Sequence, residues 1–195
     1  MYQQVSYSDQ YTFFQKLRSF DLVLLFCIIT LGIISSFSMY STDGGELLYH
    51  SKSHILRFLI FFIMMFFFSF LSIRFWHAIG YLFYIVVLGL LIWTSFYGVT
   101  SSGSKRWLNL YFINLQPSEL MKIAIIICYA KLYHRLQINN VNQIKNLVIP
   151  ITILVLPILL VVSQPDLGTS ILIAFSGIIV MWLAGINIKY FIYTF

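Results

Sequence analysis

Four charged side chains in two polar stretches of this 195-residue chain are suited to binding an anion. Arg106, Glu119 and Lys122 lie in the stretch SSGSKRWLNLYFINLQPSELMKIAI, and Asp166 lies in SQPDLGTS. Guanidinium and ammonium groups bind phosphate oxygens, while carboxylates can orient both kinds of cation. Charges are costly at the start of an apolar helix in lipid, so we expect these to have a role. The pattern therefore predicts a site for a phosphate-bearing anion.

The segment NLQPSELMK has the features of a helix start. Pro117 suits the first helical position, where its missing N–H costs nothing, and Gln116 then caps the helix. The Glu119 carboxylate can reach back to the cap N–H. Lys122 is i+3 from Glu119 and i+4 from Ser118, so the three share one face. The pair is as consistent with a structural ion pair as with a ligand site, and Lys122 could also extend toward the headgroups.

Arg106 and Asp166 each have two interpretations. The run Lys105-Arg106-Trp107 is typical of an interfacial anchor, with tryptophan at headgroup level, and equally of a phosphate contact by the arginine. Asp166 precedes an apolar segment, where aspartate commonly caps a helix. Its carboxylate could instead hold Arg106 or Lys122 across a helix bundle. In either case the aspartate adds polar groups to the same side of the molecule as the basic loop.

The composition identifies an integral membrane protein. Hydrophobic residues make up 60% of the chain, charged residues 9%, and the mean hydropathy is +0.89. A soluble domain carries about 25% charged residues, so this chain could not cover a soluble surface. The net charge of +6 then reports on topology, and no basic run interleaved with aromatics suggests a nucleic acid partner. Neither the histidines nor Cys27 and Cys128 complete a pattern of metal ligands.

The apolar runs predict an all-α fold, a polytopic bundle of about six membrane-spanning helices. A span needs about 20 apolar residues, because each residue rises about 1.5 Å across a core of about 30 Å. Continuous rather than alternating runs exclude the strands of an outer-membrane barrel. Residues 1–20 lack the features of a signal peptide and are predicted to be a cytoplasmic segment before the membrane domain 21–195. The predicted spans are 22–40, 55–73, 79–99, 117–132, 147–162 and 167–186.

Lysine and arginine residues in the loops predict the orientation. The seven basic residues on one side are Lys16, Arg18, Arg74, Lys131, Arg135, Lys145 and Lys189. The four on the other side are Lys52, Arg57, Lys105 and Arg106. The richer side is cytoplasmic by the positive-inside rule, so the N-terminus is inside and the loop 100–116 is outside. The fourth and sixth spans then begin at the outer face, where their N-terminal N–H groups favour an anion.

Two motifs resemble the shape, elongation, division and sporulation (SEDS) family. They are GSKRWLNL…FINLQPSELMKIAI and SQPDLGTSILIAFSGIIVMWLAG. Ser118 after Gln-Pro is closer to the rod-shape branch of the family than to its division branch, which usually carries alanine there. The resemblance implies a peptidoglycan glycosyltransferase of the bacterial inner membrane that polymerises lipid II during cell elongation. It also implies three partners: undecaprenyl diphosphate-linked substrate, a class B penicillin-binding protein transpeptidase, and the elongation machinery.

The resemblance also implies which residues form the site. The arginine of the family's RW motif matches Arg106, and the glutamate of its PSE motif matches Glu119. The lysine that follows matches Lys122, and the aspartate of the QPD motif matches Asp166. The family places these around a cavity that opens to the outer leaflet. We interpret the two cations as diphosphate contacts and the two carboxylates as groups that orient them. No cofactor is predicted with certainty, although a divalent cation could accompany a diphosphate.

The chain resembles only the N-terminal portion of the family. The family has ten spans, and its catalytic aspartate lies in an outer loop between the seventh and eighth, beyond Phe195. We therefore expect no catalytic residue here and no polymerase activity from the 195 residues alone. Two alternatives remain: a lipid II flippase, and a fragment that only docks a partner transpeptidase. A transporter favours charges in mid-span and inverted repeats, whereas here the charges stay at the outer ends, which favours the polymerase.

Overall fold

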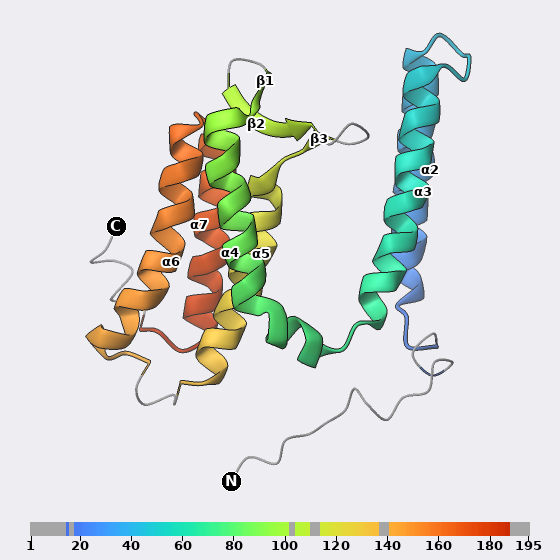
Figure 1. Cartoon of the computed structure of the whole chain (residues 1–195). Coiled ribbons are helices and arrows are strands. Elements are labelled where there is room, and N and C mark those ends of the chain that lie inside the picture. The colour runs from blue at the N-terminus through green and yellow to red at the C-terminus, as the bar shows by residue number, and fades with distance from the viewer. Residues whose placement is uncertain (1–14, 16–17, 102–103, 110–113, 137–140, 188–195) are drawn as a thin grey trace. The chain divides into compact units, whose positions relative to one another are not determined.

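The computed structural model describes residues 15, 18–101, 104–109, 114–136 and 141–187, which form two compact units. Unit 1 is Met1–Ile73 and unit 2 is Arg74–Phe195. The predicted cytoplasmic segment 1–20 lies almost wholly outside the described residues. All six predicted spans are helices, so the all-α prediction is confirmed (Figure 1).

Unit 1 is a hairpin of α2 (Leu22–Thr42) and α3 (Tyr49–Phe70). The two helices approach closely at Gly32, where an added Cβ would lie 2.2 Å from the Phe58 ring. The Ser35 hydroxyl lies 2.9 Å from Nε2 of His54, which adds a polar contact between the helices. At the tip, the Asp43 carboxylate accepts hydrogen bonds from the Ser51 N–H and hydroxyl.

Unit 2 contains α4 (Ile73–Tyr97) from its second residue on, α5 (Pro117–His134), α6 (Ile144–Ser163) and α7 (Leu167–Leu183). The helices alternate in direction, and α7 packs against both α5 and α6 (Figure 1). At Gly177 an added Cβ would lie 2.5 Å from Cδ1 of Leu154, so the glycine allows α6 and α7 to approach. The largest fully buried apolar side chains are Tyr129, Leu91, Met121, Ile125, Ile173, Val87 and Val161.

Two tyrosines join α6 to its neighbours at its prolines. Pro157 has no N–H, so the carbonyl of Ile153, four residues earlier, lacks its helical donor. The Tyr84 hydroxyl of α4 donates to that carbonyl at 2.8 Å. The Tyr129 hydroxyl of α5 donates to the carbonyl of Pro150 itself, which lies within the helix. Interior backbone groups in lipid need such partners, and here the partners also connect three helices.

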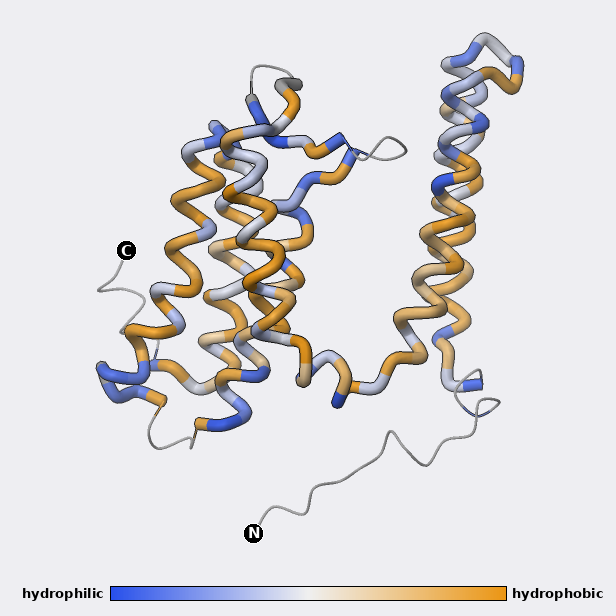
Figure 2. Tube along the Cα trace, viewed as in Figure 1, coloured by the Kyte–Doolittle hydropathy of each residue, from blue (hydrophilic) through white to orange (hydrophobic). Residues whose placement is uncertain are grey.

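Within the described residues, four helices are long and apolar enough to cross a membrane: α2, α3, α4 and residues 145–163 of α6. The α7 helix is equally apolar but has 17 residues, and α5 carries Glu119, Lys122 and Lys131 within its length. Hydrophobic residues follow the helices and hydrophilic ones gather at their ends (Figure 2). The outward faces of both units remain apolar, as expected of surfaces that contact lipid.

The helix bounds differ from the predicted spans at several ends. The second helix begins at Tyr49 and not at 55, because a helix can continue beyond the apolar run into polar residues such as Ser51 and Lys52. The third begins at Ile73 and not at 79, and it ends at Tyr97 and not at 99. The sixth ends at Leu183, three residues before the predicted end. Hydropathy marks the apolar length of a helix and not its hydrogen-bonded ends.

A small antiparallel sheet in the loop before α5 was not predicted from the sequence. Its strands are β1 (Val99–Ser101), β2 (Ser104–Asn109) and β3 (Asn114–Leu115), in the order β1-β2-β3. Val99 pairs with Trp107, and Leu108 pairs with Leu115. The loop was expected to be a simple turn. The sheet instead holds its basic residues in place at the end of the helix bundle (Figure 1).

We predict that Tyr84→Phe lowers the free energy of unfolding by about 1 kcal/mol, since it leaves the Ile153 carbonyl without a donor. Tyr97→Phe, which removes a hydroxyl from an exposed ring, is the matched control and should change little. Thermal unfolding of the two purified variants in detergent measures the difference. Equal stability of both variants would contradict the role assigned to the Tyr84 hydroxyl.

Candidate functional site

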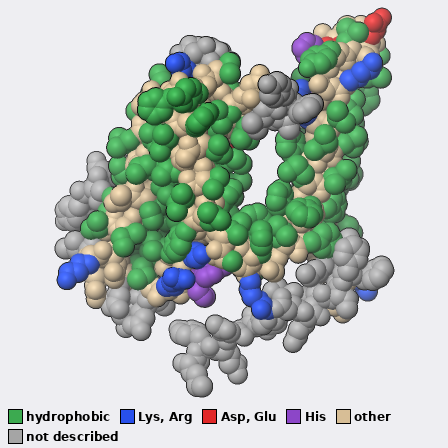
Figure 3. Space-filling view, viewed as in Figure 1, with side chains coloured by type: hydrophobic (Ala, Val, Ile, Leu, Met, Phe, Trp, Pro, Cys, Tyr) green, Lys and Arg blue, Asp and Glu red, His purple; other side chains and the backbone are tan. Residues whose placement is uncertain are grey.

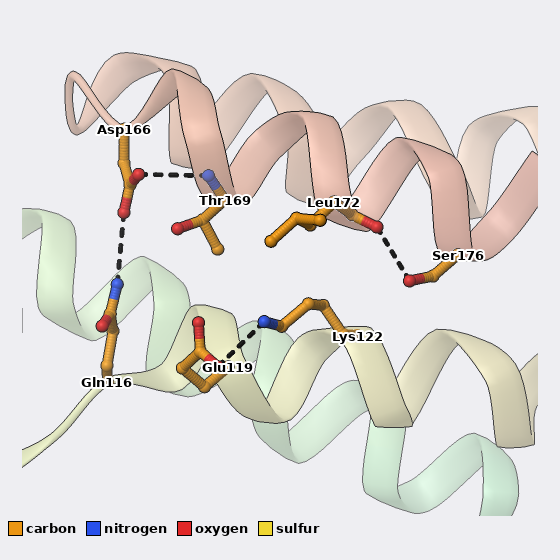
Figure 4. A network of polar contacts seen from close by, with 7 residues as sticks. All are labelled: Gln116, Glu119, Lys122, Asp166, Thr169, Leu172 and Ser176. Atoms are coloured by element: carbon orange, nitrogen blue, oxygen red, sulfur yellow. Dashed lines mark hydrogen bonds and ion pairs between the residues drawn. The ribbon is translucent and has the colours of Figure 1, made fainter.

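The candidate site lies where β2, the start of α5 and the start of α7 meet. Arg106 comes from β2, Gln116 precedes α5, and Asp166 precedes α7. One carboxylate oxygen of Asp166 lies 3.2 Å from Nη1 of Arg106 and accepts a hydrogen bond of 3.2 Å from the Gln116 amide. The other accepts from the N–H of Thr169, also at 3.2 Å (Figure 4). One carboxylate therefore joins three segments that are distant in sequence.

Asp166 thus has both roles that the sequence left open. It is the N-cap of α7, and it holds Arg106 across the bundle. Its side chain is 9% exposed, while that of Arg106 is 28% exposed. Burial acts to raise the pKa of the Asp166 carboxyl, but the hydrogen bonds from Thr169 and the charge of Arg106 hold that pKa below its usual value. The carboxylate is therefore ionised at neutral pH.

The irregular register of β2 places Arg106 for this contact. Lys105 pairs with Thr100 and Trp107 pairs with Val99, so Arg106 is an extra residue between two paired positions of the strand. Such a β-bulge takes a side chain out of the regular alternation and can redirect it. Lys105 is exposed, and Leu108, further along the strand, is buried. The bulged residue is therefore the one whose side chain reaches Asp166.

Glu119 and Lys122 form a second ion pair on the first turns of α5. The ammonium Nζ of Lys122 lies 2.8 Å from a carboxylate oxygen of Glu119 (Figure 4). The sequence allowed the Glu119 carboxylate to reach back to the N–H of Gln116 or to pair with Lys122, and the structure has the pair with Lys122. The Lys122 side chain is 23% exposed and that of Glu119 is 55% exposed. The ammonium group is thus partly buried beside a carboxylate that solvent or a ligand can reach.

The sequence did not reveal the roles of the two glutamines that precede the prolines of this region. Gln116 binds Asp166, and Gln164 is buried and donates to the Leu91 carbonyl at 3.2 Å and to the Ser95 hydroxyl at 2.8 Å. Gln164 therefore ties the turn between α6 and α7 to the end of α4. The Gln-Pro dipeptide that recurs before both helices was the feature of the sequence that could have indicated these roles.

The four predicted site residues thus form two ion pairs, Arg106 with Asp166 and Glu119 with Lys122. Gln116 connects them, since it occupies the N-cap position of the helix that carries Glu119, and its side chain, which makes no capping bond there, binds the carboxylate that holds Arg106. The site offers two cations, both partly exposed, beside two helix N-termini, which is a favourable setting for an anion. In the part of the chain that the structure describes, no cluster of three or more histidine, cysteine or acidic residues is placed to hold a metal ion.

The sequence matches the FtsW/RodA/SpoVE family, described as cell cycle proteins, over residues 17–195. The peptidoglycan glycosyltransferase MrdB of Escherichia coli K12 is 40% identical over 104 residues, which are 53% of this chain and 28% of MrdB. The probable peptidoglycan glycosyltransferase FtsW of Buchnera aphidicola subsp. Baizongia pistaciae is 29% identical over 181 residues, 92% of this chain and 47% of that protein. The chain thus spans between about a quarter and half of the length of these relatives.

Two solved structures share the fold. The Thermus thermophilus rod shape determining protein RodA aligns with a TM-score of 0.76 and 20% identity, covering 90% of this chain and 57% of that chain. A structure described as "structural coordination of polymerization and crosslinking by a peptidoglycan synthase complex" aligns with a TM-score of 0.74 and 23% identity. That alignment covers 86% of this chain and 48% of the other. The arrangement of helices is therefore that of part of a known membrane fold.

The lowered pKa of Asp166 predicts a pH dependence of stability. A carboxyl whose pKa is lower in the folded than in the unfolded chain contributes stability in full above the unfolded pKa of about 4. That contribution is lost as the pH falls through the folded pKa. Asp166→Asn should therefore lower the free energy of unfolding by about 2 kcal/mol at pH 7. The difference in this free energy between the variant and the wild type should shrink below about pH 4. Thermal unfolding in detergent across pH 3–8 checks this.

Glu46→Gln is the control for removing a negative charge, since Glu46 is exposed at the tip of unit 1. The free energy of unfolding of this variant should differ little from that of the wild type at pH 7. A constant difference between Asp166→Asn and the wild type over the whole pH range would contradict the linkage to the carboxylate.

Proposed function

The chain belongs to the FtsW/RodA/SpoVE family, and from this premise we propose that it carries the substrate-holding part of a peptidoglycan glycosyltransferase of cell elongation. Its helices are those of a multi-pass protein of the bacterial inner membrane. The relatives reported above are named peptidoglycan glycosyltransferases, which supports this class of reaction. The proposed substrate is lipid II, a disaccharide-pentapeptide on undecaprenyl diphosphate, and the proposed reaction is its polymerisation into glycan strands.

The observation that carries the proposal is the partly exposed guanidinium of Arg106, held by the buried carboxylate of Asp166 at the start of α7. A fixed, planar guanidinium matches the oxygens of a diphosphate. Asp166 binds this guanidinium, and Gln116 in turn binds Asp166. The Arg106 side chain would therefore lose little conformational freedom when it binds a ligand. Glycosyl transfer from lipid II releases undecaprenyl diphosphate, so positive charge at this place stabilises the charge that develops on the leaving group.

Lys122 supplies the second cation in this proposal. Its ammonium group has three hydrogens, and the contact with Glu119 uses one of them. Glu119 fixes the direction of the lysine, as Asp166 fixes that of Arg106. The roles of all four residues are to bind and orient the substrate, and none of them is assigned the part of general base.

The proposed partner is a class B penicillin-binding protein transpeptidase, which crosslinks the strands that the polymerase makes. The solved peptidoglycan synthase complex that shares this fold supports such an arrangement. The elongation machinery is the second proposed partner, since the relatives with this fold include a rod shape determining protein.

We predict that Arg106→Gln weakens binding of lipid II to this chain at least tenfold, because a charge-assisted hydrogen bond contributes about 1.5–3 kcal/mol. Lys105→Gln is the matched control, since this neighbour is exposed and its loss removes the same charge. Binding of fluorescent lipid II to the purified variants in detergent measures the effect. Equal binding by the two variants would contradict the role of Arg106.

A polymerisation assay tests the reaction class. The chain is purified with a class B transpeptidase, with and without a co-expressed C-terminal half of a family member, and supplied with fluorescent lipid II. Glycan chains formed only with the added half, and lost with Arg106→Gln, are the expected result. No glycan in any combination, with the transpeptidase still bound, would leave only a docking role. Movement of intact lipid II across a vesicle membrane without polymerisation would favour a flippase.

A further inference from the structure

Three aromatic side chains stand exposed on the last two turns of α4, beside the loop sheet. They are Trp93, Phe96 and Tyr97, and each is more than half exposed. The rings of Trp93 and Tyr97 lie one turn apart, with their centroids 4.8 Å from each other. We call Trp93, Phe96 and Tyr97 the aromatic end of α4.

The aromatic end continues a lipid-facing stripe of the same helix. Leu91 and Thr94, on the opposite face, are fully buried in unit 2. Three and four residues apart along the exposed face lie Leu82, Ile85 and Val86, which are all exposed. Hydrophobic side chains cover much of the visible side of unit 2, whereas lysine and arginine side chains gather near its ends (Figure 3). The aromatic end is therefore continuous with the surface that contacts lipid.

The length of α4 places its aromatic end at the level of the outer headgroups. The helix has 25 residues and is therefore about 38 Å long, which exceeds the hydrocarbon core by about 8 Å. Its first turns carry Arg74 and His77, and the positive-inside rule assigns this end to the cytoplasm. A span of about 20 residues that starts at His77 ends at Tyr97. Tryptophan and tyrosine favour that level, because each ring has an apolar body and a polar edge.

A first short connection ties the aromatic end to the residue proposed to bind the diphosphate. Gly98 follows the last aromatic residue, and its N–H donates to the Thr94 carbonyl at 2.8 Å. An added Cβ at Gly98 would lie 2.4 Å from that carbonyl oxygen, so the helix and β1 are joined closely. Val99 of β1 pairs with Trp107, the residue after Arg106. The strand that carries Arg106 is therefore held at a fixed place relative to the end of α4.

A second connection ties the partner of Arg106 to the same turns. Gln164 lies two residues before Asp166, and its amide donates to the Leu91 carbonyl at 3.2 Å and to the Ser95 hydroxyl at 2.8 Å. Asp166 in turn holds Arg106. Both members of the ion pair are thus fastened to the last turns of α4, so any change in the depth of this helix end moves both of them.

We propose that the aromatic end of α4 is an anchor in the headgroup region of the outer leaflet, and that it sets the depth of the candidate site at the level of the lipid phosphates. The inference rests on the proposed function, because a diphosphate that stays attached to a membrane lipid meets a cation only at that depth. A site held too deep or too shallow displaces either the helix or the substrate from its preferred level, which costs free energy.

Quenching of tryptophan fluorescence measures the depth of the anchor. The chain is placed in nanodiscs of phosphatidylcholine that carries a spin label either on the headgroup or near the end of the acyl chain. The contribution of Trp93 is the difference between the wild type and Trp93→Phe. We expect the headgroup label to quench this contribution more strongly than the chain-end label. Stronger quenching by the chain-end label, or quenching by neither, would overturn the anchor.

Binding of fluorescent lipid II tests whether the anchor sets the depth of the site. The double variant Trp93→Leu, Tyr97→Leu keeps the surface apolar but removes the polar edge of both rings. In nanodiscs it should bind lipid II about threefold more weakly than the wild type, since each ångström of displacement carries a modest cost. In detergent, where no bilayer fixes the depth, it should bind like the wild type. Trp93→Tyr should restore binding in nanodiscs, because an interfacial ring remains.

Trp182→Leu is the matched control, because Trp182 is 57% exposed and Trp93 is 58% exposed. Trp182 lies near the inner end of α7, so its loss should leave binding in nanodiscs unchanged. Tyr97→Leu alone decides the matter if the double variant does not fold. Equal loss of binding by the double variant in nanodiscs and detergent, unchanged binding in both, or an equal loss in Trp182→Leu would overturn the role in depth.

The same measurements separate this inference from the proposed function. Arg106→Gln should weaken the binding of lipid II in nanodiscs and in detergent alike, because it removes the contact itself and not its depth. A wild type that binds no lipid II in either medium would contradict the proposed function and overturn the role in depth. The quenching of Trp93 would still decide whether the aromatic end is an anchor.

Discussion

The architecture of unit 2 depends on the burial of one charge, the carboxylate of Asp166. A buried carboxylate must be compensated, and here the compensation comes from β2, from the residue before α5 and from the first turn of α7. The ion pair therefore fixes the position of the loop sheet relative to the helices. It also fixes the direction of Arg106, so the contact that holds the loop is the contact that presents a cation at the surface.

The same requirement recurs throughout the apolar interior. Tyr84 donates to the carbonyl that Pro157 leaves without a helical donor, and Gln164 donates to the Leu91 carbonyl at the end of α4. Lys131 donates to the Ala78 carbonyl at the other end. Each of these bonds connects two helices whose apolar faces would pack against lipid equally well. Polar contacts thus specify which helices are neighbours, while apolar surface keeps the helices in the membrane.

The sequence by itself determined the membrane class, the six helices, the family and the four charged residues of the candidate site, because apolar runs and linear motifs are local properties. It did not determine the helix ends at Tyr49 and Tyr97 or the loop sheet, since these depend on hydrogen bonds between segments. Only the tertiary structure decided that Asp166 binds Arg106 and not Lys122, and that Glu119 takes Lys122. The physical reason is distance, because each ion pair forms where the fold brings its partners together. The irregular register of β2 at Arg106 likewise depends on pairing with β1, which no single motif encodes.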